Sequence, residues 1–207
     1  MSIALAEQAR RLVHDERILE AVRRISRRDF LPKDIADSAD VDDALPIGEG
    51  QTSSQPSLVA YMIELLCLRP GHRVLEVGTG CGYQTALLAE LAGEVFSVEL
   101  VESLGERARD VLSALGYRNI RLRIGDGSSG WPEEAPFDSI IVSCAAPRVP
   151  PALLEELKVG GRLAVPLGNS GFDFFAQSDQ QLWVIEKTAS GLREQRKLPV
   201  RFVPLKT

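Results

Sequence analysis

The residues best suited to chemistry lie in a glycine-rich segment, Glu76-Val77-Gly78-Thr79-Gly80-Cys81-Gly82. The segment follows a strand-like apolar run and precedes a helical pattern. Glycines at such a position let the backbone approach a ligand closely and turn sharply into a helix N-terminus. A tight strand-to-helix turn that binds nothing gives the same pattern, so this segment alone leaves both interpretations open.

Two carboxylates, Glu99 and Asp126, each end a further strand-like run, and Asp126 stands within Gly125-Asp126-Gly127. A dinucleotide site would want a third small residue where Tyr83 stands. Two acids suit a ligand that has ribose hydroxyls and an adenine amino group but no phosphate. This pair therefore favours S-adenosylmethionine over NAD. Taken singly, Glu99 also fits a helix N-terminal acid and Asp126 an Asx turn.

The elements that must position these residues alternate between strand and helix. Strands are expected at Arg73–Val77, Glu94–Val98, Ile120–Ile124, Phe137–Ser143 and Arg162–Pro166, with helices at Gln84–Leu91 and Leu104–Leu115 between the first three. Such alternation predicts an α/β fold with a doubly wound, mostly parallel, Rossmann-like sheet. More polar segments, Gln181–Lys187 and Val200–Leu205, predict antiparallel strands near the C-terminus.

The segment before this core predicts a helical extension. Apolar residues recur at helical spacing from Leu5 to Ile25, and another helix is expected to begin at Pro56 and to end before Pro70. We expect a single domain over residues 1–207, in which residues 1–70 form a helical, substrate-side extension and residues 71–207 form the Rossmann-like core.

Composition excludes several classes of protein. The 207 residues include 44% hydrophobic and 26% charged ones, as in an ordinary globular protein, and the net charge of −5 argues against a nucleic-acid binder. The longest apolar stretch, Leu58–Leu68, is too short to cross a membrane, and the first residues do not resemble a signal peptide. We therefore expect a cytoplasmic protein, and a monomer. The three cysteines, which match neither disulfide nor metal-ligand spacing, are expected to be buried small hydrophobes; no metal site is predicted.

The segment Val74–Gly82, together with Pro136-Phe137-Asp138 and Leu157–Leu163, resembles the class I S-adenosylmethionine-dependent methyltransferases. More closely, the chain is similar to the protein-L-isoaspartate O-methyltransferase family. That likeness extends nearly end to end, and its remaining segments are Phe30-Leu31-Pro32, Leu45–Pro56, Gly125-Asp126-Gly127, Ala145-Ala146-Pro147 and Val200–Leu205. The segment Gln51-Thr52-Ser53-Ser54-Gln55-Pro56 is far more specific than the glycine loop, because most other methyltransferases of this fold lack it.

The resemblance implies methyl transfer from S-adenosylmethionine, with S-adenosylhomocysteine as product, to the free carboxylate of L-isoaspartyl residues in damaged proteins. It places Ser54 at the active site. Ala145, Ala146 and Pro147 are expected beside the substrate because small residues after a strand leave room for a peptide main chain to approach, although they also fit a plain turn. The expected cofactor contacts are Gln51, Thr52, Ser53, Ser54, Glu76, Gly78, Thr79, Gly80, Gly82, Glu99, Leu100, Gly125, Asp126 and Gly127. Two features depart from the family: Ser53 replaces a common aliphatic residue, and only two residues follow Leu205.

The implied chemistry agrees with the residues present. A carboxylate is already ionised at neutral pH and needs no general base, and neither histidine, His14 or His72, lies in a motif suited to proton abstraction. Ser54 would then orient the carboxylate by a hydrogen bond. It also fits a helix N-cap, although a helix that starts at Pro56 would be capped by Gln55. A related carboxyl methyltransferase for a dedicated peptide or small acid, and a non-catalytic cofactor-binding protein, remain alternatives.

Overall fold

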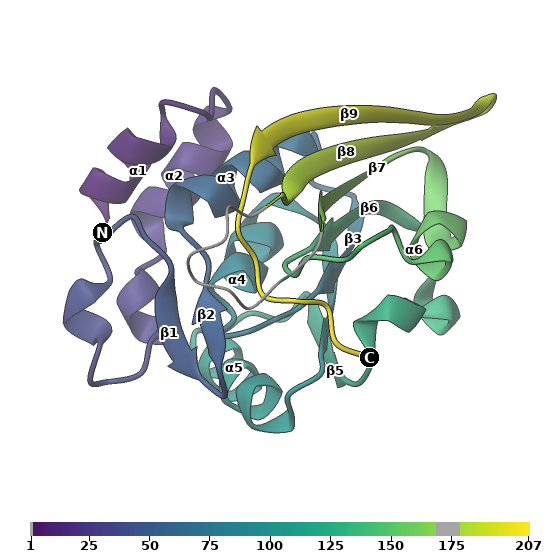
Figure 1. Cartoon of the computed structure of the whole chain (residues 1–207). Coiled ribbons are helices and arrows are strands. Elements are labelled where there is room, and N and C mark those ends of the chain that lie inside the picture. The colour runs from purple at the N-terminus through teal and green to yellow at the C-terminus, as the bar shows by residue number, and fades with distance from the viewer. Residues whose placement is uncertain (1, 169–178) are drawn as a thin grey trace.

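The computed structural model describes residues 2–168 and 179–207, which fold around one large sheet (Figure 1). Its seven strands are β3 (Arg73–Val77), β4 (Glu94–Glu99), β5 (Ile120–Ile124), β6 (Phe137–Val142), β7 (Leu157–Leu167), β8 (Gln181–Thr188) and β9 (Gly191–Pro199). They lie side by side in the order β5-β4-β3-β6-β7-β8-β9. The first five run parallel, and β8 and β9 add antiparallel edges. The predicted fold class is confirmed.

The central strands β3, β4 and β6 are buried on both faces, as their nearly continuous apolar sequences require, whereas the edge strand β5 is partly exposed. On one face, Val74 and Val95 pack into a core with the helices; on the other, Leu75 and Phe96 pack with Leu153. The helices are α1 (Ile3–Ala9), α2 (Glu16–Arg24), α3 (Pro56–Leu65), α4 (Tyr83–Leu91), α5 (Glu102–Ala114) and α6 (Pro151–Glu156). Within the described residues, no helix is both long and apolar enough to cross a membrane.

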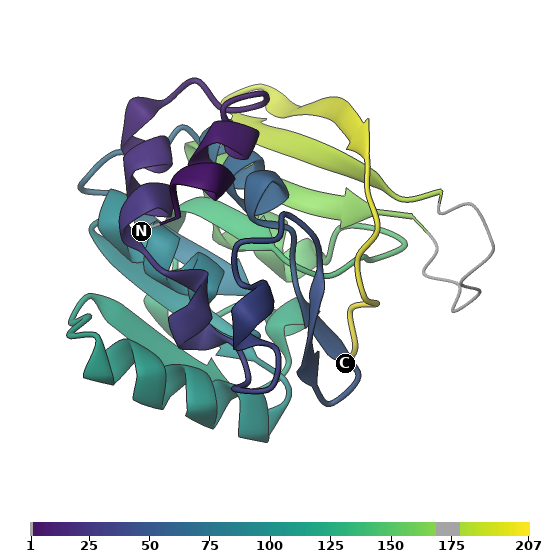
Figure 2. The ribbon, with the colours of Figure 1, turned by 90° about the vertical axis from the view of Figure 1, so that its left-hand side faces the viewer.

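Residues before β3 form a layer on one side of the sheet, which is nearest the viewer in Figure 2. It contains α1, α2 and α3, two short 3₁₀ helices, η1 (Arg27–Phe30) and η2 (Ala36–Ser38), and a hairpin of β1 (Leu45–Gly48) and β2 (Gln51–Ser53). Two more 3₁₀ helices, η3 (Gly127–Ser129) and η4 (Pro132–Glu134), follow β5. The predicted start of α3 at Pro56, with Gln55 as N-cap, is confirmed.

The prediction of a strand over Val200–Leu205 was wrong, because the last strand is β9, Gly191–Pro199. Its side chains are mostly charged and exposed, as suits the edge of a sheet, so it lacks the apolar alternation of a buried strand. Residues 200–205 instead run as a separate extended segment across the carboxyl end of β6. There, Ala145 N donates to Val203 O at 2.8 Å and Leu205 N donates to Ala145 O at 2.8 Å.

The cysteines only partly follow the prediction that all three are buried. Cys144 is buried and Cys81 is half-buried, but Cys67 is exposed. Cys67 lies just after α3 with φ of 52°, where its Sγ accepts a hydrogen bond from Arg162 Nη1 at 2.8 Å. An apolar run before Cys67 gave the impression of burial, but the helix has already ended there.

Candidate active site

The sheet order fixes where a ligand can bind. The chain leaves β3 toward β4 and β5 on one side and later returns to place β6 on the other side, so the strand order reverses between β3 and β6. Open α/β sheets bind ligands at the carboxyl ends of strands beside such a reversal. The glycine loop after β3, Glu99 at the end of β4 and Ser143 after β6 all lie at this edge.

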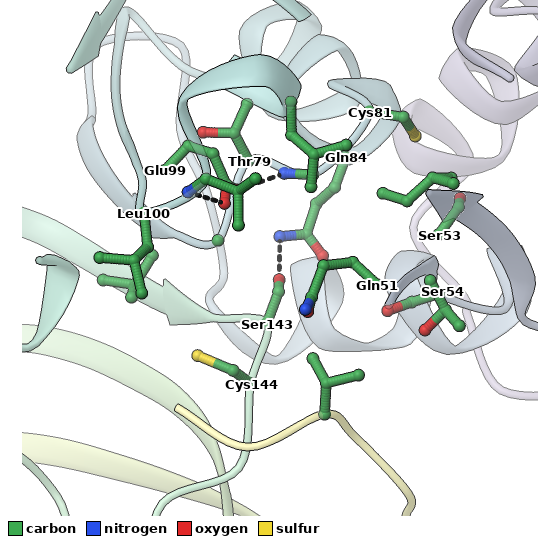
Figure 3. Close-up of a pocket in the computed structure, with 18 of the residues that line it drawn as sticks. Gln51, Ser53, Ser54, Thr79, Cys81, Gln84, Glu99, Leu100, Ser143 and Cys144 are labelled. Atoms are coloured by element: carbon green, nitrogen blue, oxygen red, sulfur yellow. Dashed lines mark hydrogen bonds between the residues drawn. The ribbon is translucent and has the colours of Figure 1, made fainter. Parts of the chain in front are cut away.

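A pocket opens at this edge (Figure 3). Ten of the predicted cofactor contacts line it: Gln51, Thr52, Ser53, Ser54, Gly78, Thr79, Gly80, Glu99, Leu100 and Gly127. Sequence reasoning missed other lining residues, notably Ile47, Gln84, Ser143, Cys144 and the segment 203–206. A polar residue that ends an apolar strand, such as Ser143, is a signal that could have been read.

The glycine loop has the conformation that glycine favours. Gly78, Gly80 and Gly82 have φ values of 94°, 56° and 91°. At Gly80 a β-carbon would lie 3.3 Å from Cδ1 of Ile47, and at Gly82 one would lie 3.3 Å from Cβ of Ala108. Gly80 therefore keeps the pocket open, whereas Gly82 lets the loop pack tightly on α5.

The carboxylate of Glu99 is held beside the glycine loop by two backbone amides. Its Oε2 accepts from Gly80 N at 2.8 Å and its Oε1 accepts from Val101 N at 2.9 Å, and only 6% of the residue is exposed. A carboxylate can accept about four hydrogen bonds. The two remaining acceptor positions suit the two vicinal hydroxyls of a ribose, so the residues fit an adenosyl group.

Four predicted cofactor residues do not line this pocket. Glu76 is fully buried beneath the loop, Gly82 packs on α5, and Gly125 and Asp126 lie beside the pocket. Asp126 Oδ1 accepts from Ser128 N at 2.8 Å, which is the Asx-turn arrangement that caps η3. Cofactor contacts by these four residues stay predictions.

Glu76 anchors a buried polar network. Its carboxylate accepts from Gln84 Nε2 at 2.9 Å, from Thr85 Oγ1 at 2.6 Å and from Ser97 Oγ at 2.6 Å. Burial raises the pKa of Glu76 to about 7, although these three hydrogen bonds oppose the shift. The network ties β3, β4 and α4 together directly under the glycine loop.

A second cavity adjoins the first. It is lined by Leu12, Asp43, Ala44, Gln55, Ser57, Leu58, Gln181, the segment 198–202, and four residues that also line the first pocket: Thr52, Ser54, Ser143 and Val203. The two spaces therefore meet at these four residues. Three of the four, Thr52, Ser54 and Ser143, carry hydroxyls; Thr52 lies on β2, Ser54 follows β2, and Ser143 reaches the junction from a distant part of the chain, after β6.

Ser54 is not a helix cap. The N-cap of α3 is Gln55, and the first-turn amide Ser57 N donates to Asp42 Oδ1 at 2.8 Å. The hydroxyl of Ser54 has no hydrogen-bond partner among the residues that the structure describes. Its side chain is thus available at the junction of the two cavities.

A buried arginine holds the loop that carries Ser54. Arg27 is 0% exposed, and its guanidinium donates to the backbone oxygens of Val41, Asp43, Ser53 and Ser54 at 3.0–3.1 Å. It also donates to Ser53 Oγ, from Nε at 3.3 Å and from Nη2 at 3.2 Å. Burial lowers the pKa of Arg27. The hydroxyl of Ser53 therefore serves as an acceptor for Arg27.

The three predicted substrate residues lie near the pockets but line neither. Ala145 and Ala146 are buried, and their backbones pair with Pro204 and Leu167, while Pro147 is exposed. Ala145 alone holds the segment 203–206 along the first pocket, through its backbone hydrogen bonds with Val203 and Leu205. Direct contact of these residues with a substrate stays a prediction.

Comparison with known proteins decides the family. The sequence profile of the protein-L-isoaspartate(D-aspartate) O-methyltransferase family matches residues 2–207. The chain belongs to this family. It is 54% identical to a protein-L-isoaspartate O-methyltransferase of Anaeromyxobacter dehalogenans, over 93% of this chain and 90% of that protein. It is 47% identical to the enzyme of that name in Gloeobacter violaceus, over 96% of this chain and 95% of that protein.

Solved structures agree with this membership. One protein-L-isoaspartate O-methyltransferase superposes with a TM-score of 0.86 at 31% identity, covering 100% of this chain and 66% of that longer chain. A second, from Plasmodium falciparum, has a TM-score of 0.83 at 23% identity, covers 99% of this chain and 98% of its own, and was solved with S-adenosyl-L-homocysteine. At that identity the second structure supports the fold alone.

Proposed function

We propose that this protein transfers a methyl group from S-adenosylmethionine to the free carboxylate of L-isoaspartyl residues in damaged proteins. The observation that carries the proposal is the meeting of two cavities at Ser54. One cavity has the glycine loop and Glu99, which suit an adenosyl group, and the other is bordered by the extended segment 198–203 and the loop before β1. A peptide in the second cavity would present its carboxylate to the first at this junction.

The cofactor pocket would be formed by the backbone of Gly78–Gly80, by the Glu99 carboxylate and by the loop Gln51–Ser54. S-adenosylmethionine supplies a methyl group on a sulfonium, which is electrophilic toward an oxygen nucleophile. The protein then has to hold the carboxylate in line with that methyl group and keep water away from it. The apolar side chains of Val77, Val98 and Cys144 line the pocket and would exclude water during this step.

The residues around the junction suit a nucleophile that needs no base. An α-carboxylate has a pKa of about 3.5 and is ionised at neutral pH. Among the described residues that line the two cavities there is no histidine. The Ser54 hydroxyl, which is free to donate, would orient the carboxylate by a hydrogen bond without becoming a nucleophile itself.

The repair outcome rests on the resemblance to the family and on ester chemistry. The neighbouring backbone amide nitrogen attacks the methyl ester carbonyl, methanol leaves and a succinimide ring forms. Water then reopens the ring at either carbonyl, so part of the product is normal aspartate.

We also propose that residues 1–70 act as the substrate-side extension of one domain, with residues 71–207 as the cofactor-binding core. The second cavity supports this division, because Leu12, Asp43 and Ser54 reach it from the extension. A monomer in the cytoplasm is the state we propose for the working protein; its three free thiols suit a reducing compartment.

The test is transfer of labelled methyl from S-adenosylmethionine to two peptides that differ only in carrying isoaspartate or aspartate. We expect label on the isoaspartyl peptide alone, released by mild base as volatile methanol. No label on either peptide, with S-adenosylhomocysteine binding shown separately, would contradict the proposal. Label on small carboxylic acids instead would indicate a related carboxyl methyltransferase.

A further inference from the structure

Ser143 is a second hydroxyl at the junction of the two cavities, and its surroundings determine how its proton points. Its Oγ accepts a hydrogen bond from Gln84 Nε2 at 2.7 Å (Figure 3). The same Nε2 also donates to Glu76 Oε1 at 2.9 Å. Both hydrogens of the Gln84 amide are therefore used, one for each partner.

The rest of the buried network fixes this orientation. Turning the Gln84 amide over would place its carbonyl oxygen against both Glu76 Oε1 and Ser143 Oγ, and both hydrogen bonds that Nε2 donates would be lost. Thr85 and Ser97 also donate to Glu76, and Ser97 in turn accepts from Thr79 Oγ1 at 2.5 Å. Gln84, Thr85 and Ser97 all donate to the Glu76 carboxylate. Ser143 is thus held as an acceptor from Gln84, which leaves its own hydroxyl proton free.

That proton has no acceptor among the described residues, and the side chain lines both cavities. Gly78 makes room for it: a β-carbon at Gly78 would lie 3.4 Å from Cβ of Ser143. The backbone of Ser143 is fixed as well, since its N donates to Val77 O at 2.8 Å. A rigidly placed donor thus borders the space that Ser54 borders from the other side.

We propose that Ser143 donates a hydrogen bond to the isoaspartyl carboxylate and that Ser54 and Ser143 together bind this group. The inference rests on the proposed function and names the residue that completes its carboxylate site. A carboxylate has two oxygens and accepts several hydrogen bonds, so two hydroxyls on separate elements can fix both its position and its rotation. Hydroxyls remain neutral donors at neutral pH and do not protonate the nucleophile.

The test compares kcat and KM of Ser143→Ala and Ser143→Thr on the isoaspartyl peptide. Removal of one hydrogen bond to a charged group predicts a loss of about tenfold in kcat/KM for Ser143→Ala, mostly through a higher KM for the peptide. Ser143→Thr retains the hydroxyl and is expected to recover most of that loss. The affinity for S-adenosylhomocysteine, measured by calorimetry, is expected to stay within about twofold of wild type.

Ser139→Ala is the matched control. Ser139 lies on β6, the strand that Ser143 follows; it is 1% exposed, and its hydroxyl has no partner in the described part of the chain. Its removal is expected to leave both kinetic constants unchanged. A Ser143→Ala protein with wild-type kcat/KM, or with an equal loss in Ser143→Thr, would overturn the inference while the proposed function stands. A wild-type protein that does not label the peptide would overturn both.

Discussion

The two sides of the candidate active site are built in different ways. The cofactor side is made of backbone: the glycine loop and the carboxyl ends of β3, β4 and β6, whose register the parallel sheet fixes. The substrate side is a loop and a short hairpin over residues 41–54, whose last residues, Gln51–Ser54, also border the cofactor pocket. Here a single buried side chain, Arg27, donates hydrogen bonds to four backbone oxygens and so fixes the position of the loop.

This difference indicates where each side is vulnerable. The geometry of the cofactor side depends on positions where only glycine fits the backbone. The geometry of the proposed substrate side depends on one distant residue, Arg27, which lies within residues 1–70. Substitutions on the cofactor side should mainly lower the affinity for the cofactor. Substitutions on the substrate side should mainly lower kcat/KM for the peptide.

The largest effect is expected for Gly80→Val. A β-branched residue at φ of 56° is strained, and its side chain would meet Ile47 at the pocket wall. We expect affinity for S-adenosylhomocysteine to fall by about 100-fold or more, measured by calorimetry. Gly116→Val is the control, because Gly116 has φ of 87° with open space around it after α5. A similar affinity loss in both variants would show that backbone strain acts only through stability.

A smaller effect, and one of a different kind, is expected for Arg27→Met. Removal of the guanidinium leaves several buried carbonyl oxygens unpaired, so the free energy of unfolding in urea should fall by about 4 kcal/mol. We also expect kcat/KM for the isoaspartyl peptide to fall by about tenfold while affinity for S-adenosylhomocysteine changes by less than about threefold.

The neighbouring Arg28→Met is the matched control for Arg27. Arg28 is exposed and pairs with the exposed Asp37 at the surface, so its loss should cost less than about 1 kcal/mol and leave catalysis unchanged. If Arg27→Met lowered cofactor affinity as much as peptide turnover, the division between the two sides would be wrong.

The last effect concerns the pH dependence of stability, not ligand binding or turnover, and it belongs to the cofactor side. Glu76 has its pKa raised from 4.5 to about 7 in the folded protein, so the fold binds its proton more tightly than the unfolded chain does. Its contribution is fully present below about pH 4.5 and is lost as pH rises toward about 7, a decrease of about 3 kcal/mol. The difference in unfolding free energy between wild type and Glu76→Gln, followed from pH 5 to pH 8, isolates this contribution. A difference that does not change with pH would contradict it.

The same contrast explains what the sequence could predict. The strands Arg73–Val77 and Ile120–Ile124 were predicted to the residue, because both lie in the regular alternation of a parallel α/β sheet. The glycine loop and Glu99 could be assigned to one pocket from their places at strand ends. On the substrate side, Ser54 came only from the family resemblance, since a serine before a helix equally suggests a cap.

Other features depend on contacts between distant segments, which no local pattern contains. The role of Arg27 depends on residues more than ten positions apart that meet in space. The strand β9 was missed because an exposed edge strand lacks apolar alternation. Asp126 shows the opposite case, since the Asx turn considered from the sequence is present, whereas its contact with a cofactor stays a prediction.

The most direct test of the account is a crystal structure of the protein with S-adenosylhomocysteine and an isoaspartyl peptide. We predict the adenosyl group beside Glu99 and the glycine loop, the peptide along the segment 198–203, and the free carboxylate within about 3 Å of the hydroxyls of Ser54 and Ser143. A carboxylate bound away from both hydroxyls, or a peptide outside the second cavity, would contradict the account.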